Sequence, residues 1–213
     1  MSELTVIVDI GIGNLRSVEK ALDTAAREQG LDATIRRSSD PEELRRAARV
    51  VMPGQSGFRD CALALEQSGL REVLLAKIRE GTPYLGICLG LQLLFEESDE
   101  APGVAGLGFF RGRVARLEPA PGIKIPHMGW NQLELGNGGH PCLDAAGGQG
   151  TWVYFVHSYS AQPSDTSLLK ATAGYGPNQV TAAIARDNVL ATQFHPEKSQ
   201  RAGLALLGAF LKS

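Results

Sequence analysis

The sequence predicts an α/β protein with a doubly wound, mainly parallel sheet, flanked by helices and extended by antiparallel additions in its second half. Strand-like and helix-like segments alternate through the first half, a rhythm typical of parallel sheets covered on both faces. After residue 105 the segments become strand-like and are joined by turn residues. A cysteine with glycines on both sides, Cys88, stands at one junction between a strand and a helix.

Each element of the first half has a local signal. Residues 4–10 are a β-branched run, and residues 15–28 carry apolar side chains at the spacing of one helix face. Asp40 followed by Pro41 predicts a helix start, because aspartate caps helices and proline suits the first position. We expect strands over 4–10, 32–37, 49–54 and 82–87, and helices over 15–28, 38–48 and 71–81, with helical spacing again over 91–98.

The second half is expected to add strands to the same domain, so that residues 1–213 form a single domain with no linker long enough to separate domains. The segments 136–139 and 145–150 are glycine-rich and read as exposed loops. Residues 200–212 predict a closing helix. The expected strands are 108–119, 129–136, 151–159, 167–176, 180–188 and 189–197.

Composition excludes several classes of protein. The formal net charge of -2 gives no electrostatic reason to expect nucleic acid or a membrane surface as a partner. The first residues lack the basic start of a signal peptide, and no apolar run approaches the ~20 residues of a membrane helix. The three cysteines are an odd, widely spaced set, which favours a reducing cytoplasm. No histidines or cysteines are paired at metal-ligand spacing, so we expect neither a metal nor a cofactor.

The segment around Cys88 predicts a nucleophile on a sharp turn. A strand, Gly86, Cys88, Gly90 and a helix follow one another, and bulky side chains two residues from the turn would collide. A helix start lowers the pKa of a thiol, and the N–H of Leu89 would point at a developing oxyanion. A buried structural cysteine is the alternative, which is how we interpret Cys61 and Cys142.

A thiolate nucleophile needs a base and a group that orients the base. His195 and Glu197 are two residues apart, so in an extended segment both side chains point the same way. Pro196 between them restricts the backbone. His157 is the competing base; it has no carboxylate nearby in sequence and is interpreted as satisfied or facing a substrate. His127 and His140 are interpreted as structural or loop residues.

Two glycine-containing loops follow strands of the first half. Residues 52–58 end the third strand, and in a doubly wound sheet such strand ends form the ligand site. We expect this loop to present backbone N–H groups to the pocket of Cys88; a phosphate loop is disfavoured because no Gly-Lys-Ser/Thr follows. Residues 11–16 lack the third glycine of a dinucleotide fingerprint, and Asn14 is expected to cap the first helix instead.

Taken together, "GICLGLQLLFEES", a "PG…GF" loop after the third strand and a late "HPE" resemble class I (triad) glutamine amidotransferase domains, whose fold is flavodoxin-like. "VDIGIGNLRSV", "PHMGWN", "YFVHSY" and "FHPEKS" narrow the resemblance to the glutaminase subunits of imidazole glycerol phosphate synthases. The resemblance runs from residue 4 to the final helix, with these motifs in the same order.

The resemblance implies hydrolysis of L-glutamine to L-glutamate and ammonia. Cys88 would form a thioester, His195 would move protons and activate water, and Glu197 would orient His195. The N–H groups of Leu89 and Gln55 would form the oxyanion hole. The positions that match glutamine-binding residues of the family are Gln92, Glu100, Ser158 and Tyr159.

The resemblance also implies a heterodimer in the cytoplasm. Ammonia would pass through a (βα)-barrel cyclase subunit to a phosphoribosyl intermediate, giving imidazole glycerol phosphate and an aminoimidazole carboxamide ribotide in histidine biosynthesis. Asn14, Trp130 and Lys198 match the partner interface of the family. No cofactor is implied.

One position departs from the family pattern. The family usually has Pro-Gly-x-Gly after the third strand, whereas here Ser56 replaces the second glycine, and a Cβ restricts the motion of such a loop. Two other functions stay open: a stand-alone hydrolase of an amide or γ-glutamyl substrate, and a non-catalytic binding module. The intact set of Cys88, His195 and Glu197 argues against the binding module.

Overall fold

A computed structural model describes residues 3–136 and 138–213, and its centre is an eight-stranded sheet in the order β2-β1-β3-β4-β13-β12-β11-β8. Strands β2, β1, β3, β4 and β13 are parallel, and β12, β11 and β8 continue the sheet in antiparallel fashion. The expected parallel sheet with antiparallel additions is therefore confirmed. The bounds are β1 Glu3–Val8, β2 Ala33–Ser38, β3 Arg49–Gly54, β4 Tyr84–Cys88, β8 Glu134–Leu135, β11 Leu169–Tyr175, β12 Asn178–Arg186 and β13 Val189–Thr192.

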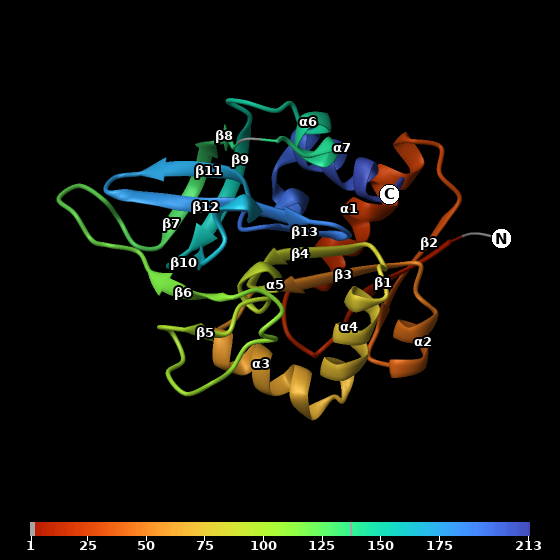
Figure 1. Ribbon diagram of the computed structural model, residues 1–213. Helices are drawn as coiled ribbons and strands as arrows, with labels where there is room; N and C mark the ends of the chain where they lie inside the picture. Colours follow the sequence, from red (N-terminus) through yellow and green to blue (C-terminus); the bar gives the residue numbers. More distant parts are fainter. Residues whose placement is uncertain (1–2, 137) are drawn as a thin grey trace.

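Helices cover both faces of this sheet (Figure 1). Helices α1, α6 and α7 pack on one face and α2, α3 and α4 on the other, each group above its own cluster of buried apolar residues. This burial is the main source of stability in such a layered fold. The bounds are α1 Leu15–Glu28, α2 Pro41–Arg46, α3 Phe58–Gln67, α4 Leu70–Arg79, α5 Leu89–Gln92, α6 Pro141–Ala145 and α7 Gln200–Phe210, with single 3-10 turns at η1 Thr166–Leu168 and η2 Pro196–Lys198.

Two smaller sheets lie beside the antiparallel half. One has the order β10-β6-β5, and the other is the two-stranded ribbon β7-β9. In the ribbon, Trp130 is paired with Tyr154 and His127 with His157. The bounds are β5 Glu97–Ser98, β6 Gly112–Arg116, β7 His127–Gln132, β9 Trp152–His157 and β10 Tyr159–Pro163.

Some expectations about the elements were wrong, and some elements were not predicted. The helical spacing after Cys88 produces only the short α5, because the carbonyls of residues 93–96 accept hydrogen bonds from the loop of residues 106–110 instead of continuing a helix. The strand expected over 189–197 ends at Thr192, and α3, α6 and β10 were not predicted. The predicted loop 136–139 includes Asn137, which lies outside the described residues.

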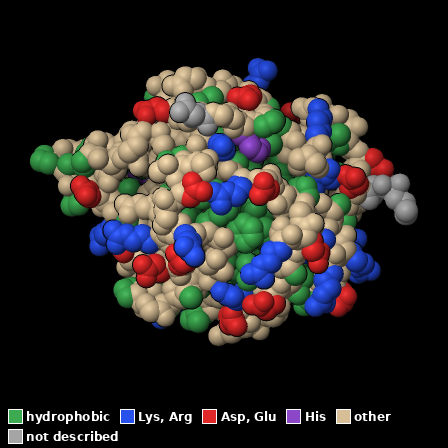
Figure 2. Space-filling view, viewed as in Figure 1, with side chains coloured by type: hydrophobic (Ala, Val, Ile, Leu, Met, Phe, Trp, Pro, Cys, Tyr) green, Lys and Arg blue, Asp and Glu red, His purple; other side chains and the backbone are tan. Residues whose placement is uncertain are grey.

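Charges of both signs are interspersed on the face of the molecule shown in Figure 2, in keeping with the small formal net charge of -2. Among the residues that the structure describes, no helix is long and apolar enough to cross a membrane.

Candidate active site

The turn from β4 to α5 holds Cys88 in a strained backbone conformation. Its φ of 55° and ψ of -103° lie where residues with a side chain are rarely found. A Cβ at Gly86 would come within 2.5 Å of the carbonyl oxygen of Gly90, and a Cβ at Gly90 within 1.8 Å of that of Met52. The predicted steric need for both glycines is therefore confirmed, and the sharp turn directs the thiol of Cys88 into the cavity described next.

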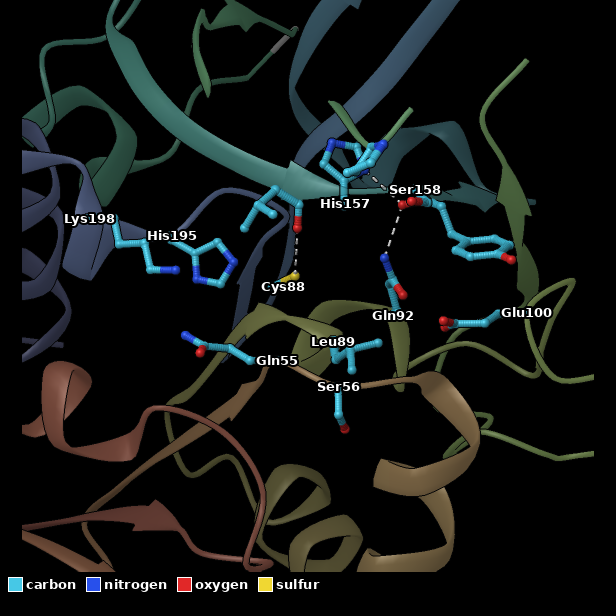
Figure 3. A pocket seen from close by; sticks show the side chains of 13 residues that line it. Gln55, Ser56, Cys88, Leu89, Gln92, Glu100, His157, Ser158, His195 and Lys198 are labelled. Atoms are coloured by element: carbon cyan, nitrogen blue, oxygen red, sulfur yellow. Dashed lines mark hydrogen bonds between the residues drawn. The ribbon is translucent and has the colours of Figure 1, made fainter. Parts of the chain in front are cut away.

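Cys88 lies in a cavity of about 360 Å³ at the carboxyl ends of β3, β4 and β13. Such a volume is in the range of small-molecule sites. Figure 3 shows the sulfur between His195, Leu89 and Gln55, with a long contact of 3.9 Å to the carbonyl of Val156. The lining residues are Gln55, Ser56, Cys88, Leu89, Gln92, Glu100, Pro126, Val156, His157, Ser158, Tyr159, His195 and Lys198.

His195 and Glu197 form a buried pair on the η2 turn. Nδ1 of His195 lies 2.8 Å from Oε1 of Glu197, and the two side chains are 1% and 0% exposed. The segment is not extended as predicted, because Lys198 N–H bonds back to the carbonyl of His195 and closes a 3-10 turn. The side chains of His195 and Glu197 are nevertheless paired, and Nε2 of His195 has no hydrogen-bond partner among the described residues.

The protonation of His195 is set by three opposing influences. Burial alone would lower the pKa of the imidazole, but hydrogen bonds and charges from Cys88 and Glu197 outweigh it and raise the pKa to about 9. This site therefore favours an imidazolium beside the sulfur of Cys88.

His157 is held in a different state. Its Nδ1 lies 2.9 Å from the carbonyl of Tyr159, and its Nε2 lies 2.9 Å from Nδ1 of His127. Burial lowers the pKa of His157 to about 3 and that of His127 to about 4. Both nitrogens of His157 are occupied, so the interpretation of this residue as satisfied is confirmed and it is a poor candidate for the base.

The loop after β3 lines the cavity and also contacts the His195–Glu197 pair. The side-chain amide of Gln55 donates to Oε1 of Glu197 at 3.4 Å and accepts from the backbone N–H of Asn14 at 3.2 Å. Ser56 places its hydroxyl 3.4 Å from the sulfur of Cys61 in α3. Leu89 and Gln55, whose N–H groups the sequence predicts as the oxyanion hole, both line the cavity.

The residues predicted to hold a substrate line the same cavity. Gln92 donates to the carbonyl of Tyr159 at 3.0 Å, and one carboxylate oxygen of Glu100 accepts from the N–H of Phe58 at 2.9 Å. The structure thus brings together Gln92, Glu100, Ser158 and Tyr159 as predicted, opposite Cys88 (Figure 3).

Of the residues predicted for a partner interface, Lys198 lines the cavity and Asn14 bonds to the lining residue Gln55. Nζ of Lys198 is 5.9 Å from the ring centre of Tyr154, which itself lies edge-on to Trp130 at 6.0 Å. Trp130 is 43% exposed. Asn14 caps α1 as predicted, with its side chain accepting from the N–H of Ser17. Sequence reasoning missed Tyr154, although its position opposite Trp130 follows from the pairing of β7 with β9.

Gln193 is a second residue that sequence reasoning missed. Its side-chain amide donates to the sulfur of Cys88 at 3.4 Å and accepts from Gln92 at 2.9 Å. The signal for Gln193 is the strand register, because Thr192 of β13 pairs with Ile87 of β4. The residues that follow this pair, Gln193 and Cys88, are therefore neighbours.

The fold and this site define a class. Residues 7–212 match the family described as glutamine amidotransferase class-I, and the chain belongs to that family. Within it, the chain is similar to proteins named imidazole glycerol phosphate synthase subunit HisH. It is 46% identical to the one from Nitrosomonas europaea over 97% of this chain and 96% of that protein, and 47% identical to the one from Methanothermobacter thermautotrophicus over 98% of each.

Solved structures agree on the fold. The chain is similar to PurLQS from Thermotoga maritima, with a TM-score of 0.73 and 19% identity over 100% of this chain and 99% of that one. It is also similar to the glutaminase domain of Trypanosoma brucei CTPS with bound acivicin, with a TM-score of 0.66 and 16% identity over 100% of this chain and 95% of that one.

Proposed function

We propose that this protein is the glutaminase subunit of an imidazole glycerol phosphate synthase and that it hydrolyses L-glutamine to L-glutamate and ammonia. The observation that carries the proposal is that Cys88 and His195 line one cavity and that His195 is bonded to Glu197 at 2.8 Å. Full-length similarity to HisH subunits supports the assignment to histidine biosynthesis.

In the first half of the reaction, Nε2 of His195 takes the proton of Cys88 and the sulfur attacks the side-chain amide carbon of glutamine. The N–H groups of Leu89 and Gln55 hold the oxyanion of the tetrahedral intermediate. The C–N bond then breaks, and the imidazolium of His195 gives its proton to the leaving ammonia. Its pKa near 9 suits that role, because it keeps the proton available beside the sulfur.

In the second half, His195 takes a proton from water, which attacks the thioester and releases glutamate and the thiol. Glu197 stabilises the imidazolium and fixes its tautomer through Nδ1. We assign the substrate contacts to Glu100, whose second carboxylate oxygen can pair with the α-ammonium of glutamine, and to Gln92 and the backbone of Ser158 and Tyr159 around the rest of the amino acid.

The proposed partner is a (βα)-barrel cyclase subunit. It would dock over the mouth of the cavity on Asn14, Trp130 and Lys198, and ammonia would pass into the barrel to a phosphoribosyl intermediate. The whole chain, residues 1–213, would act as one amidotransferase domain in such a heterodimer. Three buried free thiols suit work in a reducing cytoplasm.

The test is glutamate formation by the chain and by Cys88→Ala, each with a barrel synthase and its nucleotide ligand. We expect turnover by the wild-type complex and none by the variant, since no thioester can form. Turnover by Cys88→Ala at saturating glutamine would refute the mechanism. High turnover without any barrel would instead support a stand-alone amide or γ-glutamyl hydrolase.

A further inference from the structure

The sulfur of Cys88 has a polar side chain beside it that the proposed mechanism does not use, in addition to the carbonyl of Val156 at 3.9 Å. Nε2 of Gln193 lies 3.4 Å from the sulfur, and the side chain of Gln193 is fully buried. Gln193 follows the end of β13, whose register with β4 sets it beside Cys88. His195 is two residues further on, so alternate side chains of one segment converge on one sulfur.

The orientation of the Gln193 amide follows from its neighbours. The carbonyl of Tyr159 can only accept, so the atom of Gln92 that lies 3.0 Å from it must be the NH₂ nitrogen. The same nitrogen lies 2.9 Å from the other end of Gln193, which must therefore be its carbonyl oxygen. The remaining end of Gln193, which faces Cys88, is the NH₂ group.

The hydrogen bonds run from the sulfur of Cys88 through Gln193 and Gln92 to the carbonyl of Tyr159. His157 also donates to the carbonyl of Tyr159, at 2.9 Å, so both lone pairs of that oxygen are used. Gln92 is 3% exposed. A buried chain of hydrogen bonds of this kind resists reorientation of any one amide. The N–H of Gln193 is thus held toward the sulfur before any substrate arrives.

We propose that Gln193 stabilises the thiolate of Cys88 by donating a fixed side-chain hydrogen bond to the sulfur. The inference rests on the proposed function in taking Cys88 as the nucleophile. A hydrogen bond to an anion is stronger than one to a neutral thiol, and more so where water is excluded. Gln193 therefore favours the ionised sulfur, while His195 receives its proton.

The test is the rate at which iodoacetamide alkylates Cys88 in the full-length chain, followed by peptide mass spectrometry over a range of pH. The thiolate displaces iodide from the CH₂ carbon and forms a C–S bond, so the rate reports the ionised fraction without glutamine. In Gln193→Leu, which removes the donor at similar volume, we expect alkylation at neutral pH to slow on the order of 10- to 100-fold. At alkaline pH, where Cys88 is ionised in both the wild type and Gln193→Leu, the alkylation rates of the two proteins should converge.

The variant Gln193→Glu removes the hydrogen-bond donor to the sulfur but keeps the acceptor for Gln92. A carboxylate still accepts from Gln92 but offers the sulfur no N–H, so we expect alkylation at least as slow as in Gln193→Leu. Gln162→Leu, on the exposed part of β10, is the matched control and should alkylate at the wild-type rate. The Glu variant also carries the test if the Leu variant does not fold.

Wild-type alkylation at neutral pH in either Gln193 variant would overturn the inference, as would a deficit that persists unchanged at alkaline pH. These outcomes are distinct from failure of the proposed function. A Cys88→Ala chain that still hydrolyses glutamine would refute the nucleophile, whatever the alkylation rates of the Gln193 variants.

Discussion

Among single residues, the three cysteines have very different surroundings. Cys88 opens into the cavity, whereas burial raises the pKa of the Cys61 thiol and raises that of Cys142 to about 11. A diazo-ketone analogue of glutamine should therefore label Cys88 and spare the other two, because only a thiolate is a good nucleophile. Mass spectrometry of the labelled peptides measures this. Label found mainly on Cys61 or Cys142 would contradict the assignment.

The protonation of His195 gives a pH-dependent prediction. Burial lowers its pKa, and Cys88 and Glu197 together raise it to about 9. We expect the pKa to fall in Cys88→Ala and in Glu197→Gln, and to drop below about 6.5 in the double variant, where burial alone remains. NMR titration of the imidazole measures each midpoint. An unchanged midpoint in the double variant would show that the two side chains do not control His195.

The same shift has a consequence for stability. The pKa of about 9 in the folded protein lies above the usual histidine value of about 6.5. The protonated imidazole therefore contributes stability that is fully present below about 6.5 and is lost as pH rises through about 9.

Among the elements, α7 supports the turn that carries the His–Glu pair. Gly203 of α7 lies against η2, and a Cβ there would come 1.8 Å from the carbonyl oxygen of Pro196. Gly203→Ala should lower the free energy of unfolding by about 1–3 kcal/mol and also reduce glutamine hydrolysis, because the turn must shift. Denaturant unfolding and glutamate assays measure the two effects.

Gly208 provides the matched control in the same helix. A Cβ at this position would approach only the flexible side chain of Gln29, at 2.9 Å. Gly208→Ala should therefore change stability little and leave glutaminase activity unchanged. Equal effects of the two substitutions would mean that the contact between α7 and η2 does not position His195 and Glu197.

The loop after β3 carries the one departure from the family motif. Ser56 adds a Cβ and a hydroxyl contact of 3.4 Å to Cys61. We propose that both restrain the reorientation of this loop toward the predicted oxyanion hole. We expect Ser56→Gly to raise glutamine hydrolysis by the chain without a partner, because glycine reaches positive φ at little cost. Ser56→Ala removes only the hydroxyl and isolates the effect of the Cβ. An unchanged partner-free rate in a folded Ser56→Gly protein would contradict this role.

Elements with local signals were predictable from the sequence. The apolar stripe of 15–28 gave α1 with its observed bounds, and Asp40–Pro41 placed the start of α2. The glycines around Cys88 predicted the turn from β4 to α5, because their role is a steric one between close neighbours.

Elements that depend on distant partners were not predictable. Helix α3 begins at Phe58, and Gly57 before it has no side chain to cap the helix; the N–H of Phe58 is satisfied by Glu100, far along the chain. The shortness of α5 depends on hydrogen bonds from residues 106–110. The role of Gln193 likewise needs the register of β13 against β4, which no local pattern reveals.

At the scale of the whole molecule, the cavity and the ribbon β7-β9 are neighbours. The cavity forms where β3, β4 and β13 end, and Val156 and His157 of β9 belong to its lining; Figure 1 shows the ribbon beside the antiparallel half of the sheet. The ribbon carries the exposed side chains Met128, Trp130 and Trp152, which are 62%, 43% and 55% exposed. Apolar side chains this exposed next to an active-site mouth are typical of a protein interface.

This arrangement predicts a chain that is a poor glutaminase alone and is activated by a barrel subunit. An enzyme that delivers ammonia to a second site gains nothing from hydrolysis while that site is empty, and one missing oxyanion donor costs ~10²–10³-fold in rate. Lys198 directly follows Glu197 and lies over Tyr154, so a carboxylate of the partner that pairs with Lys198 would act next to the triad. Trp130 offers the large rigid surface of an interface anchor.

Calorimetric titration with the barrel subunit, on wild type, Trp130→Ala and Lys198→Ala, tests this interface. We expect Trp130→Ala to weaken binding by more than 1 kcal/mol, roughly the threshold for interface anchors, and Lys198→Ala to reduce activation of glutamine hydrolysis. Leu63→Ala is the control, since Leu63 is 44% exposed on α3, away from the ribbon. Unchanged affinity and unchanged activation in both Trp130→Ala and Lys198→Ala would place the docking surface elsewhere on the molecule.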